Sequence, residues 1–317
     1  MRKRNLKPAG LFLSEFAMTK HPYTKKATTY AEQIRILRDR GMEISEEDQA
    51  AFALKHFNYY RLAAYWLPFE DSHATHSFKA GTDFDDVLAL YEFDRKFRVL
   101  TLDILERIEV SVRAQWAYRL GHLHGAHAHL DPALAQNRRH WQQNKDDLKK
   151  EVARSEEVFI RHLTGTYQEE LPPVWAVCEV MSLGLLSRWY ANLKPMHTRK
   201  LIADTYGVDE AVFSSWLHHL SVVRNICAHH SRFWNRDFTR VHPSRSQNKP
   251  AILKNQFVSN NKPYNSLLIL LHLSDIVAPH DEWRRKLLDL LEAGDSRNLT
   301  DIGFPEDWKQ RDIWRSV

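Results

Sequence analysis

The segment from Trp216 to His230 holds the densest group of side chains in this chain that could do chemistry. In a helix, one side of the segment is apolar and carries Leu217, Leu220 and Cys227. The other side is polar and carries His218, Ser221, Asn225 and His229, with Arg224 at its border. Arginine, asparagine and histidine without neighbouring acids can hold a phosphate and move a proton beside it.

This set of groups suits the attack of an RNA 2′-hydroxyl on the adjacent phosphate. Histidine titrates near neutrality, so His229 could take or give a proton. Arg224 offers a planar fork of donors for the charge that develops on the phosphoryl oxygens, and Asn225 could orient the imidazole or contact the phosphate. The predicted products are a 2′,3′-cyclic phosphate and a 5′-hydroxyl, with no metal ion and no other cofactor.

The spacing of the arginine and the histidine does not decide the matter alone, because Arg119 and His124 are spaced in the same way. Arg224 and His229 also lie about 140° apart on an ideal helix. They meet one phosphate only if the helix loosens at this point, or if two copies of the chain come together across a two-fold axis.

The charge of the chain is concentrated in two segments. Residues 1–26 carry +6 and residues 224–262 carry +7, in a chain of net charge +5, so the remaining residues carry −8. Basic segments on an acidic body indicate contact with a polyanion, because neutralising phosphates releases counterions. The RNA-binding residues predicted here are Arg113, Arg232, Arg236 and Arg240. The alternative is a basic arm and a solvated loop that touch nothing.

Composition favours an all-α fold that stays out of membranes. The 317 residues include ten glycines and twelve prolines, too few for the frequent turns of an all-β protein. Two cysteines, Cys178 and Cys227, exclude a disulfide scaffold and a four-thiolate zinc site. No apolar run approaches the length of a membrane span, and the N-terminus lacks the apolar core of a signal peptide. We therefore expect a soluble, cytoplasmic protein.

Four regions are predicted: a basic arm (1–26), an N-terminal helical unit (27–80), a helical core (81–236), and a basic loop with C-terminal helices (237–317). The core begins with a long helix over about residues 85–120, whose buried face is Leu90, Phe97, Ile104, Leu105, Ile108 and Val112. A charged helix over about 140–163 follows, then one that starts after Pro173 and weakens at 182–184, and then the motif helix after Asp209. On the motif helix we expect Trp216, Leu217 and Leu220 to be buried.

Three features allow two interpretations. Asp94/Arg98 and Glu109/Arg113 have the spacing of ion pairs on a helix, which fits either a structural ladder or a polar groove for a ligand. The aromatic residues of 57–66 could stack on bases, although core packing is more common. Four histidines (His122, His124, His127, His129) raise the question of a metal, but their spacing matches no familiar site, and a transition from helix to loop is favoured.

Four blocks of the chain resemble the Abi-like (AbiD/AbiF-type) abortive-infection proteins, a family of the HEPN superfamily. They are residues 58–62 (NYYRL), residues 91–96 (YEFDRK) with 106–110 (ERIEV), residues 175–187, and the signature RNICAHHSRFWN at 224–235. The resemblance implies a HEPN-type helical bundle and a metal-independent endoribonuclease, with its site shared between two copies in a homodimer. The motif residues then correspond to Arg224, Asn225 and His229, with His230 as a second candidate histidine. Glu109, Arg113 or Glu179 would line the cleft from a facing helix.

The leading hypothesis is accordingly an abortive-infection toxin that cleaves cellular RNA, with tRNA among the candidate targets, and that is restrained by a small RNA or a protein antitoxin. The alternative is a non-catalytic RNA-binding or sensing protein in a defence or toxin–antitoxin system. A metal-dependent hydrolase built on the His122–His129 cluster is the third hypothesis.

Overall fold

The protein is described here by a computed structural model, which covers residue 22 and residues 24–245, 250–294 and 296–315. Most of the basic arm predicted over residues 1–26 lies outside these ranges, as does Lys249. The described chain is all-α, as predicted, apart from a small antiparallel hairpin of β1 (Glu70–Ser72) and β2 (Ser77–Phe78). None of its helices combines the length and the apolar character that crossing a membrane requires.

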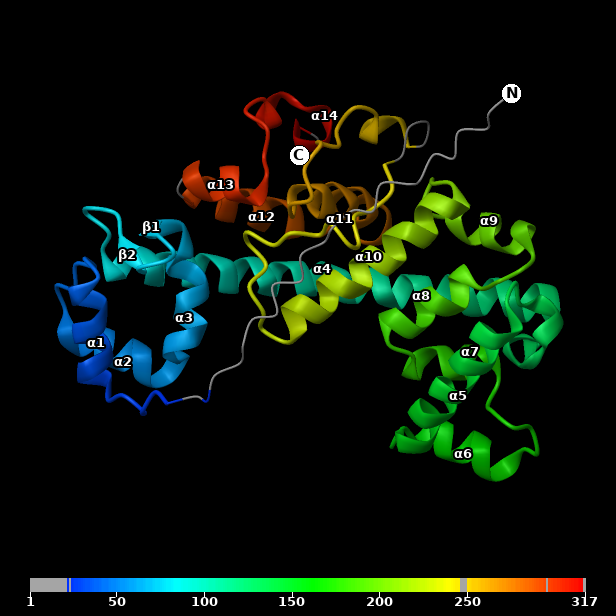
Figure 1. The fold of residues 1–317 in the computed structure, drawn as a ribbon. Helices are drawn as coiled ribbons and strands as arrows, with labels where there is room; N and C mark the ends of the chain where they lie inside the picture. Colours follow the sequence, from blue (N-terminus) through cyan, green and yellow to red (C-terminus); the bar gives the residue numbers. More distant parts are fainter. Residues whose placement is uncertain (1–21, 23, 246–249, 295, 316–317) are drawn as a thin grey trace, which may run out of the picture.

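A helix of 41 residues, α4 (Phe84–His124), is the central element of the fold (Figure 1). It begins where the carboxylate of Asp83 accepts a hydrogen bond from the backbone N–H of Asp85, and it ends before Gly125, whose φ is +87°. All six residues predicted for its inner face are buried, so the helical period of the sequence placed this face correctly.

The N-terminal unit packs beside the start of α4 (Figure 1). It consists of α1 (Tyr30–Asp39), α2 (Glu47–Phe57), α3 (Tyr59–Trp66) and the β1–β2 hairpin. A capping box starts α1, because Thr29 and Glu32 each accept the other's backbone N–H. In the aromatic segment, Tyr65 and Trp66 are buried, which confirms core packing there, whereas Tyr60 is 75% exposed.

Five shorter helices cover the far end of α4: α5 (Arg138–Arg154), α6 (Val158–Thr166), α7 (Val174–Val177), α8 (Leu183–Ala191) and α9 (Met196–Asp204). The single charged helix predicted over 140–163 is wrong, because the chain is extended at Ser155 and Glu157 and so separates α5 from α6. The helix after Pro173 is not bent but broken: Met181 is extended, and Ser182 caps the N-terminus of α8.

The motif helix, α10 (Glu210–Ala228), crosses α4 and packs against α8, α9 and α11 as well (Figure 1). The last helices, α11 (Tyr264–Val277), α12 (Trp283–Ala293), α13 (Ser296–Ile302) and α14 (Asp312–Arg315), lie together on the other side of α4 from α5 and α6. The first eleven residues of α11 are all buried, so this helix forms the centre of the C-terminal part. The indole N–H of Trp283 donates to the carbonyl of Leu100 and ties α12 to α4.

Candidate active site

The motif helix buries one side and leaves its C-terminal end accessible. Trp216, Leu217 and Leu220 are fully buried, as predicted, whereas Asn225 is exposed and the Arg224 side chain is 38% exposed. Ser221 was predicted to lie in the polar stripe, but it is buried: α8 packs over it, with Gly184 close by, and its hydroxyl donates to the carbonyl of His218. The polar stripe is therefore shorter than the helical wheel indicates.

The helix ends in a tight capping turn that carries both histidines. The N–H of His230 donates to the carbonyl of Cys227, and the N–H of Ser231 donates to the carbonyl of Ile226, which is the Schellman arrangement. His230 occupies the left-handed position of this turn, with φ +56°, where glycine is usual. Because α10 ends at Ala228, His229 and His230 both project from the turn, and both are exposed.

A carboxylate on α4 lies between two guanidinium groups. Oε1 of Glu109 is 2.5 Å from Nη2 of Arg113, and its Oε2 is 3.8 Å from Nε of Arg224. The same Nη2 of Arg113 donates to the carbonyl of Met181 at 2.6 Å, at the break between α7 and α8. Of the facing residues considered, Glu109 contacts the motif arginine directly, while Glu179 accepts a weak hydrogen bond from the thiol of Cys178. Two cations and one anion leave this cluster net positive, so it can accept a phosphate.

The other ion pair on α4 has a different task. The carboxylate of Asp94 accepts the backbone N–H of Trp234 at 2.7 Å and that of Phe233 at 3.3 Å, and it also accepts the hydroxyl of Tyr65 at 2.6 Å. Its ion pair with Arg98 is buried. Burial raises the pKa of Asp94, while Arg98 and the three hydrogen bonds act in the opposite direction. This pair is structural: it holds the segment that follows the histidine turn.

Two arginines join the histidine turn to α3 by a reciprocal exchange. Nη1 of Arg61 donates to the carbonyl of His230 at 2.7 Å, and Nη1 of Arg232 donates to the carbonyl of Ala64 at 2.5 Å. Arg232 therefore serves the last turn of α3, in addition to any role at the surface. Arg61 was not among the predicted site residues, and only its place in the block NYYRL pointed to it.

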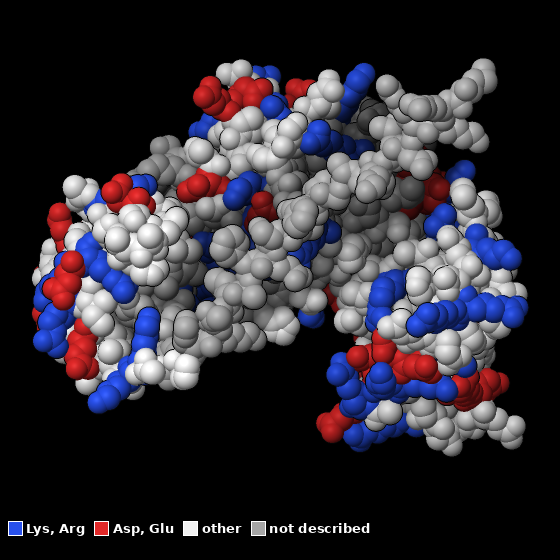
Figure 2. All heavy atoms as spheres, viewed as in Figure 1, with Lys and Arg blue, Asp and Glu red and all other residues white. Residues whose placement is uncertain are grey.

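The remaining predicted RNA-binding residues, Arg236 and Arg240, are exposed. In the part of the chain that the structure describes, neither forms an ion pair, whereas Arg224 pairs with Glu109. The surface of α5 and α6 differs, because acidic and basic side chains alternate there (Figure 2), as in the pairs of Arg188 with Asp147 and Lys145 with Glu170. A surface of mixed sign is not a tract for a polyanion.

The histidine-rich segment is split between the end of α4 and the loop after Gly125. Nε2 of His124 is 2.9 Å from the hydroxyl of Thr198, and His129 is buried, with its pKa lowered to about 4 by the loss of solvent. Among the described residues, no group of three histidine, cysteine or acidic side chains is arranged to hold a metal ion. The four histidines therefore do not form a shared site in this structure.

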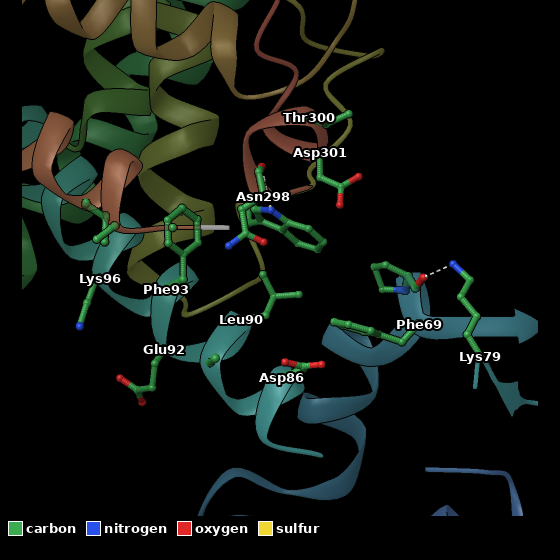
Figure 3. Close-up of a pocket in the computed structure, with 16 residues that line it drawn as sticks. Phe69, Lys79, Asp86, Leu90, Glu92, Phe93, Lys96, Asn298, Thr300 and Asp301 are labelled. Atoms are coloured by element: carbon green, nitrogen blue, oxygen red, sulfur yellow. Dashed lines mark hydrogen bonds between the residues drawn. The ribbon is translucent and has the colours of Figure 1, made fainter. Parts of the chain in front are cut away.

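A cleft of about 710 Å³ lies between the start of α4, the β1–β2 region and α12–α13 (Figure 3). Trp234 of the signature is among its lining residues. Its charged side chains are mixed, with Lys79 and Lys96 on one hand and Asp86, Glu92 and Asp301 on the other. The ammonium of Lys79 is already used, because it donates to the carbonyl of Pro68 (Figure 3). Three carboxylates make this cleft unsuitable for a phosphate chain.

Comparison with known proteins gives one match. The sequence profile of a family described as "Abi-like protein" matches residues 52–235, which is more than half of the chain and includes α3, α4, α10 and the histidine turn. Searches of curated proteins and of solved structures gave no match. The family suggests a role in abortive infection, the defence of a cell population against phage. The chain belongs to the family of Abi-like proteins.

Proposed function

We propose that this protein is a metal-independent endoribonuclease of the HEPN type that acts in abortive infection. The observation that carries the proposal is the accessible end of α10, where a partly exposed Arg224 and the exposed Asn225, His229 and His230 lie within seven residues of chain. The rest of this helix is mostly buried. A helix end that concentrates these polar groups suits a reacting phosphate better than it suits packing.

In the proposed reaction, the substrate 2′-oxygen attacks the adjacent phosphorus while the bond from phosphorus to the 5′-oxygen breaks. His229 takes the proton of the 2′-hydroxyl as general base, a contribution of roughly 10²–10⁴-fold. Arg224 donates to the phosphoryl oxygens as negative charge develops there. A second imidazole, from His230 or from a twin chain, returns a proton to the leaving 5′-oxygen. The products are a 2′,3′-cyclic phosphate and a 5′-hydroxyl.

Glu109 and Arg113 complete the proposed site from the facing helix. The Glu109 carboxylate restrains the orientation of Arg224, and Arg113 adds a second positive charge close to the place where the phosphate would lie. Because one carboxylate serves two guanidinium groups, its charge does not cancel theirs. Arg236 and Arg240 extend the basic surface along the chain after the histidine turn and would contact the RNA backbone.

The proposed partners follow from this chemistry. The substrate is cellular RNA, with tRNA as one candidate, and the active form is a homodimer in which the arginine and histidine of two chains share a cleft. A toxin of this kind acts in the cytoplasm and needs restraint by a small RNA or a protein antitoxin.

The decisive test uses purified protein and labelled RNA in the presence of a chelator. We expect the wild type to cleave RNA, to spare an oligonucleotide with 2′-deoxy residues, and to leave a 2′,3′-cyclic phosphate. Arg224→Ala and His229→Ala should each lower the cleavage rate at least about 100-fold. Arg154→Ala and His140→Ala change the same residue types at exposed positions on α5 and are the matched controls. Full activity of both site variants would overturn the catalytic assignment.

The alternative function, a non-catalytic RNA-binding protein, draws on the ion pair between Arg224 and Glu109 and on the exposed Arg236 and Arg240. The binding protein and the nuclease predict different outcomes for the cleavage experiment on labelled RNA. Strong binding that weakens steeply with salt, with both the ribose and the 2′-deoxy strands left intact, would favour the binding protein.

A further inference from the structure

A cleft of about 390 Å³ opens between the second half of α4 and the segment of α7 that faces it. It is lined on the α4 side by Tyr118, Gly121 and His122, and on the other side by Trp175, Cys178 and Glu179. Neither the family match nor the proposed reaction gives this cleft a role.

Two large aromatic rings of the cleft face solvent. Trp175 is 55% exposed and Tyr118 is 56% exposed. The indole of Trp175 packs against α4 at Gly121, where its Cε3 is 3.4 Å from the place that a Cβ would occupy. The Tyr118 ring packs against His122, with ring centroids 4.3 Å apart, and the guanidinium of Arg119 lies 5.6 Å from the tyrosine centroid. Aromatic faces that are held in place but left uncovered can stack with a planar ligand.

The contacts of Arg113 connect the proposed phosphate site to the segment that forms one wall of the aromatic cleft. Arg113 donates to the carbonyl of Met181, three residues after Cys178, and on its other side it pairs with Glu109, which contacts Arg224. Burial raises the pKa of the Cys178 thiol to about 12, and the nearby Arg113 opposes this rise. The arginine therefore lies between the two places: it is next in the chain to Ala114, which lines the aromatic cleft, and it belongs to the cluster that would bind phosphate.

We propose that this cleft is a base-binding subsite, in which one unpaired nucleotide next to the scissile phosphate of a single-stranded RNA stacks on Trp175 or Tyr118. The proposal rests on the proposed ribonuclease function and deepens it. Aromatic platforms beside a cationic track are how proteins hold single strands, because bases in a duplex are already stacked and paired. The RNA target is then an unpaired loop or end and not a duplex.

Glu179 adds a preference among the bases. Its carboxylate lines the cleft, and a carboxylate can only accept hydrogen bonds when it is ionised. Adenine, guanine and cytosine carry an exocyclic amino group that projects from the ring and can donate to it, whereas uracil offers only its ring N3–H. We expect uracil to be the least favoured base in this subsite, and Glu179→Gln to reduce the discrimination, because an amide both donates and accepts.

The test measures binding and not cleavage, so that it does not depend on the reaction. In a His229→Ala background, the affinity for a fluorescein-labelled single-stranded RNA is measured by anisotropy, with an abasic nucleotide placed at each position in turn. Trp175→Ala should weaken binding of the intact RNA about 5- to 100-fold, and Trp175→Phe should restore most of that loss. At one abasic position the effect of Trp175→Ala should disappear, because the base it would contact is missing.

Unchanged affinity in Trp175→Ala, or an equal loss at every abasic position, would overturn the subsite. The subsite would also be overturned if Trp175→Ala lowered the oligomeric mass measured by light scattering and no base-dependent binding were found. That result would make the cleft a contact between copies of the chain. The two proposals fail separately. Base-dependent binding without cleavage by the wild type would leave the subsite and remove the nuclease. Cleavage at an unchanged rate in Trp175→Ala would leave the nuclease and remove the subsite.

Discussion

Two ion pairs of the same kind lie on α4, and they are used in opposite ways. Asp94 with Arg98 and Glu109 with Arg113 both join an acid to an arginine four residues later. The first pair is closed to solvent, with side chains 0% and 4% exposed, whereas the second is partly open, at 8% and 18%. The two pairs have the same spacing in the sequence, and only the side chains and backbone packed around each pair distinguish one from the other.

The two pairs differ in the hydrogen-bond donors that their carboxylates accept. Asp94 accepts hydrogen bonds from two other parts of the chain: the hydroxyl of Tyr65 on α3, and the backbone N–H groups of Phe233 and Trp234. Glu109 is shared by two guanidinium groups, and one of them, that of Arg224, is accessible. A fully satisfied buried carboxylate fixes the backbone, while one shared between cations leaves positive charge free for a ligand. The closed pair holds the segment that follows the histidine turn, and the open pair contacts the motif arginine.

The largest expected effect comes from breaking the closed pair. Asp94→Ala leaves the buried guanidinium of Arg98 and two backbone N–H groups without their acceptor, so we expect the free energy of unfolding to fall by about 3–5 kcal/mol. Urea denaturation followed by circular dichroism measures this. Asp86→Ala, an exposed acid near the start of α4, is the control and should change stability by less than about 0.5 kcal/mol. A loss below about 1 kcal/mol in Asp94→Ala would show that the network does not carry the fold.

The same contrast between closed and open holds for the histidines of α10. His219 is buried, with its ring nitrogens 2.6 Å from the carbonyl of Val241 and 2.8 Å from the hydroxyl of Ser266, and burial lowers its pKa to about 4. The unfolded chain takes up this proton near pH 6.5, so the stabilising effect of the neutral ring is complete above that pH and is lost as the pH falls toward 4. The loss amounts to about 3 kcal/mol.

Unfolding measured by urea at several pH values between 7.5 and 4 tests this. His129 and His272 have lowered pKa values as well, so the wild type should show the combined slope of several buried histidines. His219→Gln should reduce that slope by about one proton, whereas His218→Gln, at the exposed neighbour, should leave it unchanged. An identical slope in His219→Gln and the wild type would contradict the assignment.

The open pair predicts an effect on cleavage more than on stability. In Glu109→Gln the amide can still accept one hydrogen bond, but it no longer balances the charges of Arg113 and Arg224, so Arg224 loses its orientation. We expect kcat to fall about 10- to 100-fold while KM does not rise, because the positive charge that attracts RNA is retained. Steady-state cleavage assays separate the two constants, and Glu106→Gln, an exposed acid on the same helix, is the control. A higher KM at unchanged kcat would mean that Glu109 acts on binding alone.

The sequence was sufficient for features that depend on local pattern. The buried face of α4 and the buried positions Trp216, Leu217 and Leu220 follow from the helical period, and all are confirmed. The same rules failed at Ser221, because a helical wheel gives the direction of a side chain but not the helix that packs over it.

Features that depend on contacts between distant parts of the chain could not be predicted from the sequence. The partners of Asp94 are 29 and 140 residues away along the chain, at Tyr65 and Trp234, so its spacing to Arg98 could not separate a structural clamp from a ligand groove. The exchange between Arg61 and His230 likewise spans 169 residues. Whether Arg224 and His229 act on one phosphate stays a prediction, because it depends on a second copy of the chain.

The smallest expected effect concerns the turn that carries His229 and His230, and it separates the two candidate histidines. His230 has φ +56°, which costs a residue with a Cβ about 1 kcal/mol more than glycine, so His230→Gly should raise the free energy of unfolding by roughly 0.5–1 kcal/mol. His230→Ala also removes the imidazole but keeps the Cβ, so the difference between the two variants isolates the backbone strain. If the general acid is an imidazole of the twin chain and not His230, both variants should keep most of the cleavage activity measured on labelled RNA. A loss of activity as large as that of His229→Ala, in both variants, would show that His230 has a catalytic role of its own.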